Sequence, residues 1–288
     1  MYGLMTRTVD DLEWEVFDRH CYEVKDVTGR SAQPAPGVVN TISCFADNAA
    51  VDAEPSLVAV DEAGRPATRE RPYFDWSTVC PSSDRYREGV LDIVDDCVAV
   101  APDVRLDDVG FPRDGYCHCD RCKADFEESH YDEYGEWRAS VITDFIAEVA
   151  NRIPGKTIVT LYPDPYPDHL FHRSGIDLEA IEPLVDEFVV PLYDTAYGTT
   201  YWLETIARGF DTLLDTPFAV EVYAVNVDLD ALVHATEVAA GTADSVIFGY
   251  DASAGQAAIR RIRADERDGV THGEPSTGDR GEEQQPDR

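Results

Sequence analysis

Short apolar segments alternate with longer amphipathic segments along most of this chain. Six of the apolar segments are rich in β-branched and aromatic residues and end near an Asp, Asn or Pro, which is typical of buried parallel strands. They span residues 38–45, 104–111, 157–162, 187–194, 218–225 and 245–251. Residues 2–7 and 73–79 supply two further candidate strands.

The segments between these strands have the length and polarity of helices. They cover residues 84–100, 120–152, 175–186, 199–214, 228–240 and 254–266. This alternation predicts an α/β fold, and eight strands within ~250 residues match a (β/α)₈ TIM barrel. The rival is a doubly wound open sheet, but no Gly-x-Gly-x-x-Gly follows any strand, which disfavours its nucleotide-binding form.

We therefore expect a single barrel domain over residues 1–266. The Pro- and Ala-rich segment 46–72 is expected to form a loop over the barrel mouth. From residue 267 to residue 288 the sequence turns to Gly, Glu, Gln, Pro and Asp, which predicts a disordered acidic tail.

The charge of the chain is strongly one-sided. Its 288 residues include 57 acidic side chains against 24 Lys and Arg, for a formal net charge of −33. A nucleic-acid-binding protein needs the opposite sign, so this class is excluded. We interpret the charge as adaptation to high intracellular salt, where screening removes self-repulsion. An acidic protein made for a basic partner is the alternative.

Neither a membrane span nor a signal peptide is predicted. No apolar run approaches the ~20 residues of a membrane span, and the N-terminus lacks a basic region followed by an apolar one. We therefore expect a cytoplasmic protein that does not bind membranes. In that compartment its seven cysteines are expected to be reduced, which favours metal ligation over disulfide bonds.

Three cysteines lie close together in a Cys-x-Cys-x-x-Cys motif, Cys117, Cys119 and Cys122. This spacing suits a tetrahedral zinc site that takes one more ligand from elsewhere. Cys80 is the best candidate, with Cys44 in reserve. Four thiolates leave no open position for water, so the zinc would be structural. The remaining candidates are assigned other roles: His118 is expected to face solvent, and Cys21 and Cys97 to be small core residues within helices.

Acidic and tyrosine side chains recur where the predicted strands end. In a TIM barrel these ends form the active site. The residues concerned are Asp107, Asp108, Tyr162, Asp194, Tyr223 and Asp251. Glu221 differs because it lies within an apolar strand, where an unpaired carboxylate would cost several kcal/mol. Paired carboxylates across a pocket are the groups that cleave glycosidic bonds.

Aromatic side chains near these strand ends are candidates for stacking on sugar rings. They are Trp76, Tyr166, Tyr197, Tyr201 and Trp202.

The segment from Asp107-Asp108 through Cys117-His-Cys-Asp-Arg-Cys122-Lys-Ala-Asp-Phe126, followed by Trp137, resembles the β-galactosidases of glycoside hydrolase family 42. It also resembles related TIM barrels described as hypothetical glycosyl hydrolases. The resemblance implies that Asp108 is the acid/base, that Glu221 on the seventh strand is the nucleophile, and that Cys80 joins the three other thiols around structural zinc. Family 42 has Asn-Glu where this chain has Asp107-Asp108.

We therefore predict a glycoside hydrolase that uses Asp108 as general acid and Glu221 as nucleophile or base. Sugar hydroxyls would be bound by Asp107, Tyr162, Asp194, Tyr223 and Asp251. The expected partner is a carbohydrate, and assembly into a homo-oligomer is left open. The alternative is a non-catalytic carbohydrate-binding or scaffold barrel that keeps only the zinc site. A metal-dependent hydrolase would need His ligands at strand ends, where only His169 and His172 lie nearby.

Overall fold

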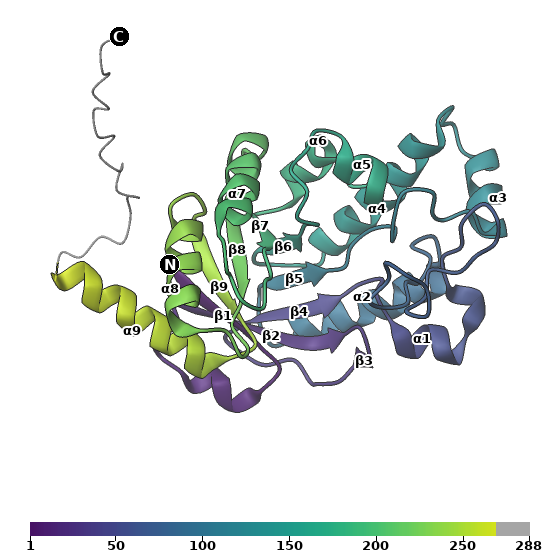
Figure 1. Ribbon diagram of the computed structural model, residues 1–288. Helices are drawn as coiled ribbons and strands as arrows, with labels where there is room; N and C mark the ends of the chain where they lie inside the picture. The colour runs from purple at the N-terminus through teal and green to yellow at the C-terminus, as the bar shows by residue number, and fades with distance from the viewer. Residues whose placement is uncertain (269–288) are drawn as a thin grey trace, which may run out of the picture.

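The computed structural model describes residues 1–268, and these form a closed barrel of eight parallel strands (Figure 1). The barrel strands are β1 (Tyr2–Thr6), β2 (Arg19–Asp26), β4 (Val39–Ser43), β5 (Val104–Asp107), β6 (Thr157–Thr160), β7 (Glu187–Pro191), β8 (Phe218–Tyr223) and β9 (Ser245–Gly249). The ring closes because β1 pairs with both β2 and β9. The predicted (β/α)₈ barrel is confirmed. Residues 269–288, most of the predicted tail, lie outside the described residues.

One predicted strand is wrong, and one real strand was missed. Residues 73–79 make only isolated bridges, from Thr78 to Ala46 and from Val79 to Val58. The second barrel strand is instead β2, so Cys21 lies in a strand rather than in a helix. The strand β2 is hard to recognise from the sequence because it contains charged residues. One of them, Lys25, is buried, and its ammonium donates to the carbonyl oxygen of Ser43 at 2.7 Å. The two errors cancel in the strand count, so Asp107 still ends the fourth strand.

Helices cover the barrel from β4 onward. The longer ones are α2 (Asp84–Val98), α3 (Asp120–Glu128), α4 (Tyr134–Ala150), α7 (Tyr201–Leu213), α8 (Leu229–Ala240) and α9 (Ala252–Asp268). Shorter ones are α1 (Asn48–Ala53), α5 (His169–Ser174) and α6 (Leu178–Ile181), besides the 3₁₀ turns η1 (Val9–Glu13), η2 (Pro55–Leu57) and η3 (Glu182–Leu184). The predicted helix 120–152 is interrupted between α3 and α4, and the predicted helix 175–186 is only α6 and η3.

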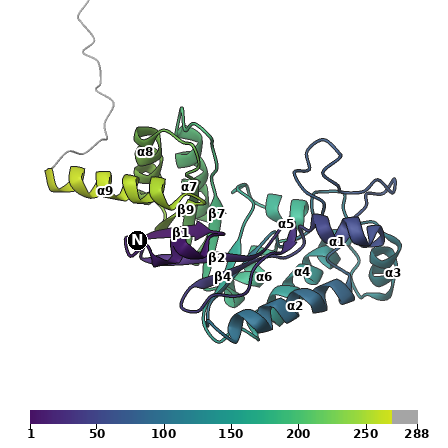
Figure 2. The ribbon, with the colours of Figure 1, turned by 90° about the horizontal axis from the view of Figure 1, so that it is seen from below.

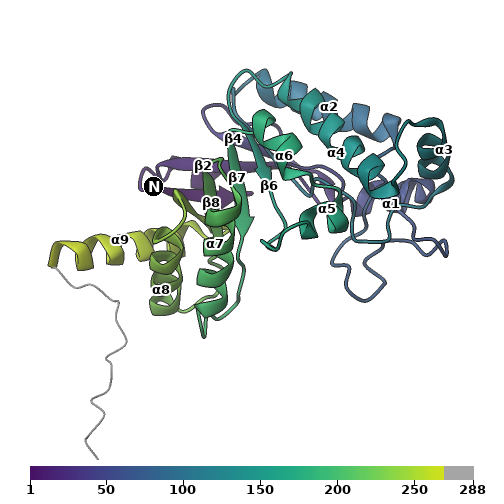
Figure 3. The same ribbon diagram turned by 90° about the horizontal axis from the view of Figure 1, so that it is seen from above.

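The connections early in the chain differ from the others. The link from β1 to β2 contains only η1, and β2 continues into the short antiparallel strand β3 (Gly29–Arg30) before β4. Figures 2 and 3 show α1 and α3 together at one end of the molecule, opposite α9. No helix within residues 1–268 has the length and apolarity needed to cross a bilayer.

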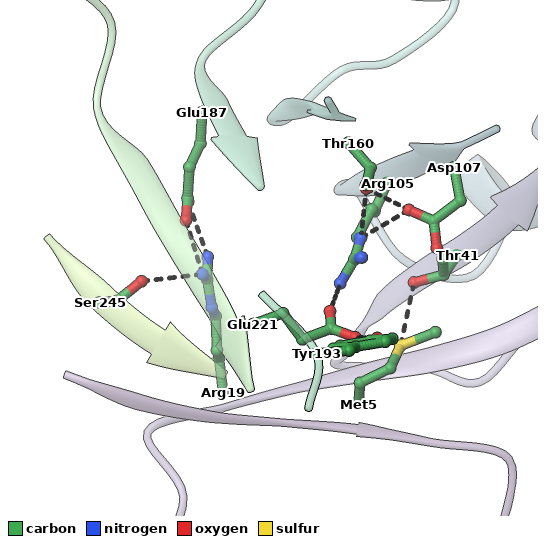
Figure 4. A network of polar contacts seen from close by, with 10 residues as sticks. All are labelled: Met5, Arg19, Thr41, Arg105, Asp107, Thr160, Glu187, Tyr193, Glu221 and Ser245. Atoms are coloured by element: carbon green, nitrogen blue, oxygen red, sulfur yellow. Dashed lines mark hydrogen bonds and ion pairs between the residues drawn. The ribbon is translucent and has the colours of Figure 1, made fainter. Parts of the chain in front are cut away.

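Side chains fill the inside of the barrel in layers. Alternate strand residues face inward, and they form an apolar cluster of Met5, Cys21, Val39, Ile158, Val189, Ala219 and Ile247. Towards the start of the strands, Arg19 donates to the carboxylate of Glu187 at 2.5 and 2.6 Å and to Ser245 at 3.0 Å. A second charged group, around Arg105 and Glu221, is separate from the first (Figure 4). The interior is therefore packed rather than open.

Candidate active site and metal site

A cavity of about 570 Å³ lies at the carboxyl ends of β5, β6 and β7. Its lining includes residues 108–112 after β5, residues 160–163 at the end of β6, and Pro191 and Tyr193 at the end of β7. The outer wall comes from residues 73–76 and from Trp202 on α7. In TIM barrels this edge carries the active site. Residues 73–76 thus help to form the mouth of the barrel. They directly follow the segment 46–72, which was expected to form a loop over this mouth.

Asp108 lines this cavity from the first position after β5. Its φ of +53° places a non-glycine residue in the left-handed region, a conformation that costs energy and recurs at functional sites. The hydroxyl of Ser43 donates to its carboxylate at 2.6 Å. Burial, and secondarily the neighbouring charge of Asp107, raise the pKa of Asp108 to about 6. A carboxyl with this pKa is partly protonated near neutral pH and can donate a proton.

Glu221 lies behind the cavity rather than in its wall. The residue is completely buried, and its two carboxylate oxygens accept hydrogen bonds from the hydroxyl of Tyr193 and the guanidinium of Arg105 (Figure 4). Tyr193 itself lines the cavity and is 43% exposed. The phenol of Tyr193 therefore stands between Glu221 and the space in which a ligand would bind.

Arg105 joins Glu221 to Asp107. It is 2% exposed, and its Nε lies 2.8 Å from a carboxylate oxygen of Asp107 and 2.9 Å from the hydroxyl of Thr160. Thr160 donates in turn to Asp107. Since Arg105 and Thr160 both bind Asp107, that carboxylate belongs to the buried network, and it does not line the cavity.

The other predicted sugar-binding residues are divided between the cavity and its surroundings. Tyr162 lines the cavity and is 48% exposed. Asp194, Tyr223 and Asp251 are not part of its lining. Asp251 accepts a hydrogen bond from the backbone of Ala254 in the first turn of α9, and the Tyr223 ring packs against that of Tyr193 at 5.6 Å between centroids.

The candidate aromatic residues are divided in the same way. Trp76 and Trp202 line the cavity. Tyr197 is buried and donates to the carbonyl of Leu192, while Tyr166 and Tyr201 are exposed outside the lining. Two aromatic residues of the wall, Tyr73 and Phe74, were missed because residues 73–79 were predicted to form a barrel strand. The sequence feature that could have identified them is the aromatic-rich segment Tyr-Phe-Asp-Trp, which directly follows a Pro-rich segment.

Four thiols converge beside the loop that follows Asp108. The Sγ atoms of Cys80, Cys117, Cys119 and Cys122 all lie within 4.8 Å of one another. Cys80 Sγ lies 3.3 Å from that of Cys122 and 3.7 Å from that of Cys119. Four thiolates at Zn–S distances of about 2.3 Å would be about 3.8 Å apart, so the donor set fits a tetrahedral metal ion.

The fourth thiol is that of Cys80, and Cys44 lies elsewhere, with its Sγ 3.6 Å from the carbonyl oxygen of Ile42. His118 does not join the cluster. Its ring stacks on Tyr134 at 4.7 Å and is only partly accessible, so the prediction that it faces solvent is wrong in part.

The cysteine cluster connects two walls of the cavity. The amide of Val60 lies 3.4 Å from Cys117 Sγ, and the amide of His118 donates to the carbonyl of Val60 at 2.7 Å. Cys80 follows the wall residues 73–76, and Cys117 follows the loop that begins at Asp108. A metal bound by the four thiols would therefore fix both walls.

Histidine does not build a metal site at the strand ends. His169 lies 2.9 Å from the carboxylate of Asp164 on the surface, and His172 is exposed. Within residues 1–268 the four cysteines form the one group of His, Cys, Asp or Glu side chains arranged to hold a metal. The hypothesis of a metal-dependent hydrolase with His ligands therefore has no support in the described part of the chain.

No protein-family profile matches this sequence, and neither does a curated protein sequence. Among solved structures, the fold is similar to that of α-L-fucosidase isoenzyme 2 from Paenibacillus thiaminolyticus, with a TM-score of 0.64 and 14% identity. That match covers 92% of this chain and 49% of the fucosidase chain, so this chain spans about half the length of that protein. A β-N-acetylhexosaminidase from Bacteroides fragilis matches with a TM-score of 0.51 and 10% identity, over 92% of this chain and 70% of the other. At these identities the likeness shows a shared fold.

Proposed function

We propose that this protein is a glycoside hydrolase whose general acid is Asp108. The observation that carries the proposal is a carboxyl group of raised pKa in the wall of an aromatic-lined cavity at the carboxyl end of a TIM barrel. The fold supports it, since the two similar structures are a fucosidase and a hexosaminidase. Asp108 would protonate the oxygen of the leaving group as the glycosidic bond breaks.

Glu221 is the proposed nucleophile or base. Arg105 forms a buried ion pair with it, and either role uses the carboxylate form. The hydroxyl of Tyr193 covers its other oxygen. Substrate would reach Glu221 when the Tyr193 ring turns aside, after which the carboxylate attacks the anomeric carbon or activates a water molecule.

The walls of the cavity suit a sugar ring. Trp76, Tyr162 and Trp202 present aromatic surface, on which the C–H faces of a saccharide can pack. Of the predicted sugar-binding residues, Tyr162 lines the cavity and would bind a sugar hydroxyl there. A role in sugar binding for Asp107, Asp194, Tyr223 and Asp251 stays a prediction, since these residues lie outside the lining.

Zinc is the proposed metal of the four cysteines. Four thiolates in tetrahedral arrangement are typical of structural zinc sites, and they leave no position for water or substrate. The ion would stabilise the fold of the two walls and take no part in bond cleavage.

A non-catalytic carbohydrate-binding barrel is the second candidate. The observation in its favour is that both oxygens of Glu221 are hydrogen-bonded within the protein, and that the residue is completely buried. A carboxylate satisfied in this way can serve the stability of the barrel alone.

The test is a screen of chromogenic glycosides at molar KCl, with wild type, Asp108→Asn and Glu221→Gln. The proposal expects hydrolysis by the wild type and a loss of about 10²- to 10⁴-fold in kcat on removing the general acid. Asp215→Asn is the matched control, because Asp215 is exposed and precedes β8, away from the cavity. Activity that survives both site substitutions would refute the assignment, and sugar binding without turnover would favour the second candidate.

We further infer that the protein works in the cytoplasm of a cell with high internal salt. The net charge of −33 supports this inference, because such a surface repels itself strongly where salt does not screen it.

A further inference from the structure

Arg173 is a half-buried residue in the last turn of α5, and it lines the same cavity as Asp108. Its guanidinium carbon lies 3.6 Å from the centroid of the Tyr162 ring, which is a cation–π stack. Tyr162 also lines the cavity. The stack therefore places a fixed positive charge at the wall of the proposed sugar site.

This arginine has no acidic partner within residues 1–268. No described carboxylate lies within 4.0 Å of its guanidinium nitrogens, which also donate no hydrogen bond to the described part of the protein. Two other arginines that stack on aromatic rings have such partners, Arg7 with Glu23 and Arg71 with Asp61, whereas Arg113 and Arg138 have none in the described chain. Arg173 differs from Arg113 and Arg138 in that its side chain also lines the cavity.

The backbone around Arg173 is held firmly. Arg138 donates to the carbonyl oxygens of His172 and Arg173 at 2.9 and 3.0 Å. The carbonyl of Ser174 accepts from the amide of Phe111 at 2.9 Å. Gly110 has a φ of +135°, and a Cβ on it would lie 2.8 Å from Ser174, so only glycine permits this close contact. The end of α5 is thereby fixed to the loop that follows Asp108.

The geometry leaves the hydrogen-bonding edge of the guanidinium available. Tyr162 covers one face of the planar group, while the five N–H donors lie in its plane and have no protein acceptor. Such a planar fork binds carboxylate and sulfate groups through two parallel hydrogen bonds. Because Arg173 is half-buried, salt screens its interaction with a ligand less than it screens exposed charges.

We propose that Arg173 determines specificity by binding an anionic substituent, a carboxylate or a sulfate ester, on the saccharide that occupies the cavity. The inference rests on the proposed carbohydrate site, and it assigns the substrate to the acidic sugars. A contribution of Arg173 to the carboxyl end of α5 is the structural explanation that the experiment must separate from this one.

Binding is measured by calorimetry at molar KCl in the Asp108→Asn background, so that hydrolysis is not required. The probes are methyl β-glucuronide, methyl β-galactoside 6-sulfate, and the neutral methyl β-glucoside and methyl β-galactoside. Arg173→Gln is compared with Arg113→Gln as the matched control. Arg113 also stacks on a tyrosine, Tyr73, and has no acidic partner in the described chain, but it does not line the cavity.

Arg173→Gln is expected to weaken binding of one of the anionic probes by about 10- to 100-fold and to leave the neutral probes within about twofold. Arg113→Gln should leave all four unchanged. Arg173→Lys keeps the charge but loses the planar fork, so it should recover only part of the affinity. Whichever anion binds more tightly identifies the substituent.

Equal losses for neutral and anionic probes would overturn the inference, because they would show a structural role only. Equal losses in the Arg113 and Arg173 variants would also overturn it, since a distant charge would then have the same effect. Unfolding temperatures of the variants show whether each one is folded. Arg173-dependent binding without hydrolysis by the wild type would refute the proposed catalysis and leave the inference standing.

Discussion

The hydroxyl of Ser43 donates a hydrogen bond of 2.6 Å to the carboxylate of Asp108, and so joins the end of β4 to the end of β5. The carbonyl of the same serine accepts from the buried ammonium of Lys25, on β2, at 2.7 Å. Both the Ser43 hydrogen bond and the Lys25 charge lower the pKa of Asp108, against the larger effect of burial. Three neighbouring strands thus set the proton affinity of the proposed general acid.

Ser43→Ala should raise the pKa of Asp108 above about 6, because it removes a hydrogen bond that stabilises the ionised form. The alkaline limb of the pH–rate profile, which reports loss of the acid's proton, should move to higher pH. Ser140→Ala is the control, since Ser140 donates to a carbonyl within α4. An alkaline limb unmoved by Ser43→Ala would show that another group supplies the proton.

Asp108→Asn should stabilise the fold at alkaline pH while it lowers kcat by about 10²- to 10⁴-fold. The pKa of Asp108 is raised from 3.8 to about 6, so ionisation favours the unfolded chain. The stability present below pH ~4 is lost as the pH rises through about 6, by at most about 3 kcal/mol. The gain from the substitution should therefore be near zero at pH ~4 and largest at pH ~8 in urea titrations. A gain independent of pH would contradict this explanation.

Arg105→Met should destabilise the barrel by about 3 to 5 kcal/mol, because it leaves Glu221 buried without its cation. The double variant Arg105→Met, Glu221→Met should recover part of this loss in chemical denaturation. Arg152→Met removes an exposed ion pair with Asp95 and should cost less than about 1 kcal/mol. Independent, additive effects at positions 105 and 221 would show that the pair is not coupled.

The purified protein should contain one zinc ion per chain, measured by elemental analysis. Cys119→Ser should lose the metal and lower the unfolding temperature, since one of four thiolates is removed. Cys44→Ser should keep the full metal content, because Cys44 lies outside the cluster. Wild-type protein isolated without metal, yet equally stable after treatment with a chelator, would rule out a structural ion.

The unfolding temperature should rise as KCl is increased from about 0.1 M to about 3 M, because shorter screening lengths reduce repulsion among the surface carboxylates. Sucrose at matched osmolality is the control, since it favours compact states without screening charge. An unfolding temperature that responds equally to both would assign the effect to the exclusion of solute rather than to charge.

Local patterns in the sequence were enough to place several site residues. The apolar run that begins at Val104 ends at Asp107, and the carboxyl ends of parallel strands gather at one edge, which put Asp108 at the barrel mouth. The motif formed by Cys117, Cys119 and Cys122 can be recognised from its spacing alone. Cys80 was chosen as the fourth ligand because the ends of neighbouring strands were expected to lie close together, although Cys80 in fact lies in a loop.

Long-range pairing could not be predicted in the same way. The strand β2 was not recognised, and Cys21 was placed in a helix instead. The partners that allow Lys25 to be buried, Asp47 and Ser43, are distant in sequence and visible only in the fold. Arg105 could have been identified from the sequence by the same reasoning as Glu221. Each is a charged residue within an apolar strand, and each therefore needs a buried partner. Nothing in the sequence singled out Arg173, whose importance depends on the absence of a neighbouring carboxylate.

The pairing of β1 with β9 has a consequence for the order of events during synthesis. Residues 2–6 leave the ribosome long before one of their two partner strands, residues 245–249, which lies far later in the sequence. Until then β1 can add to β2 alone, and both edges of the nascent sheet stay unpaired. The growing polypeptide must therefore remain soluble as an open sheet, with these edges protected from aggregation until residues 245–249 have emerged.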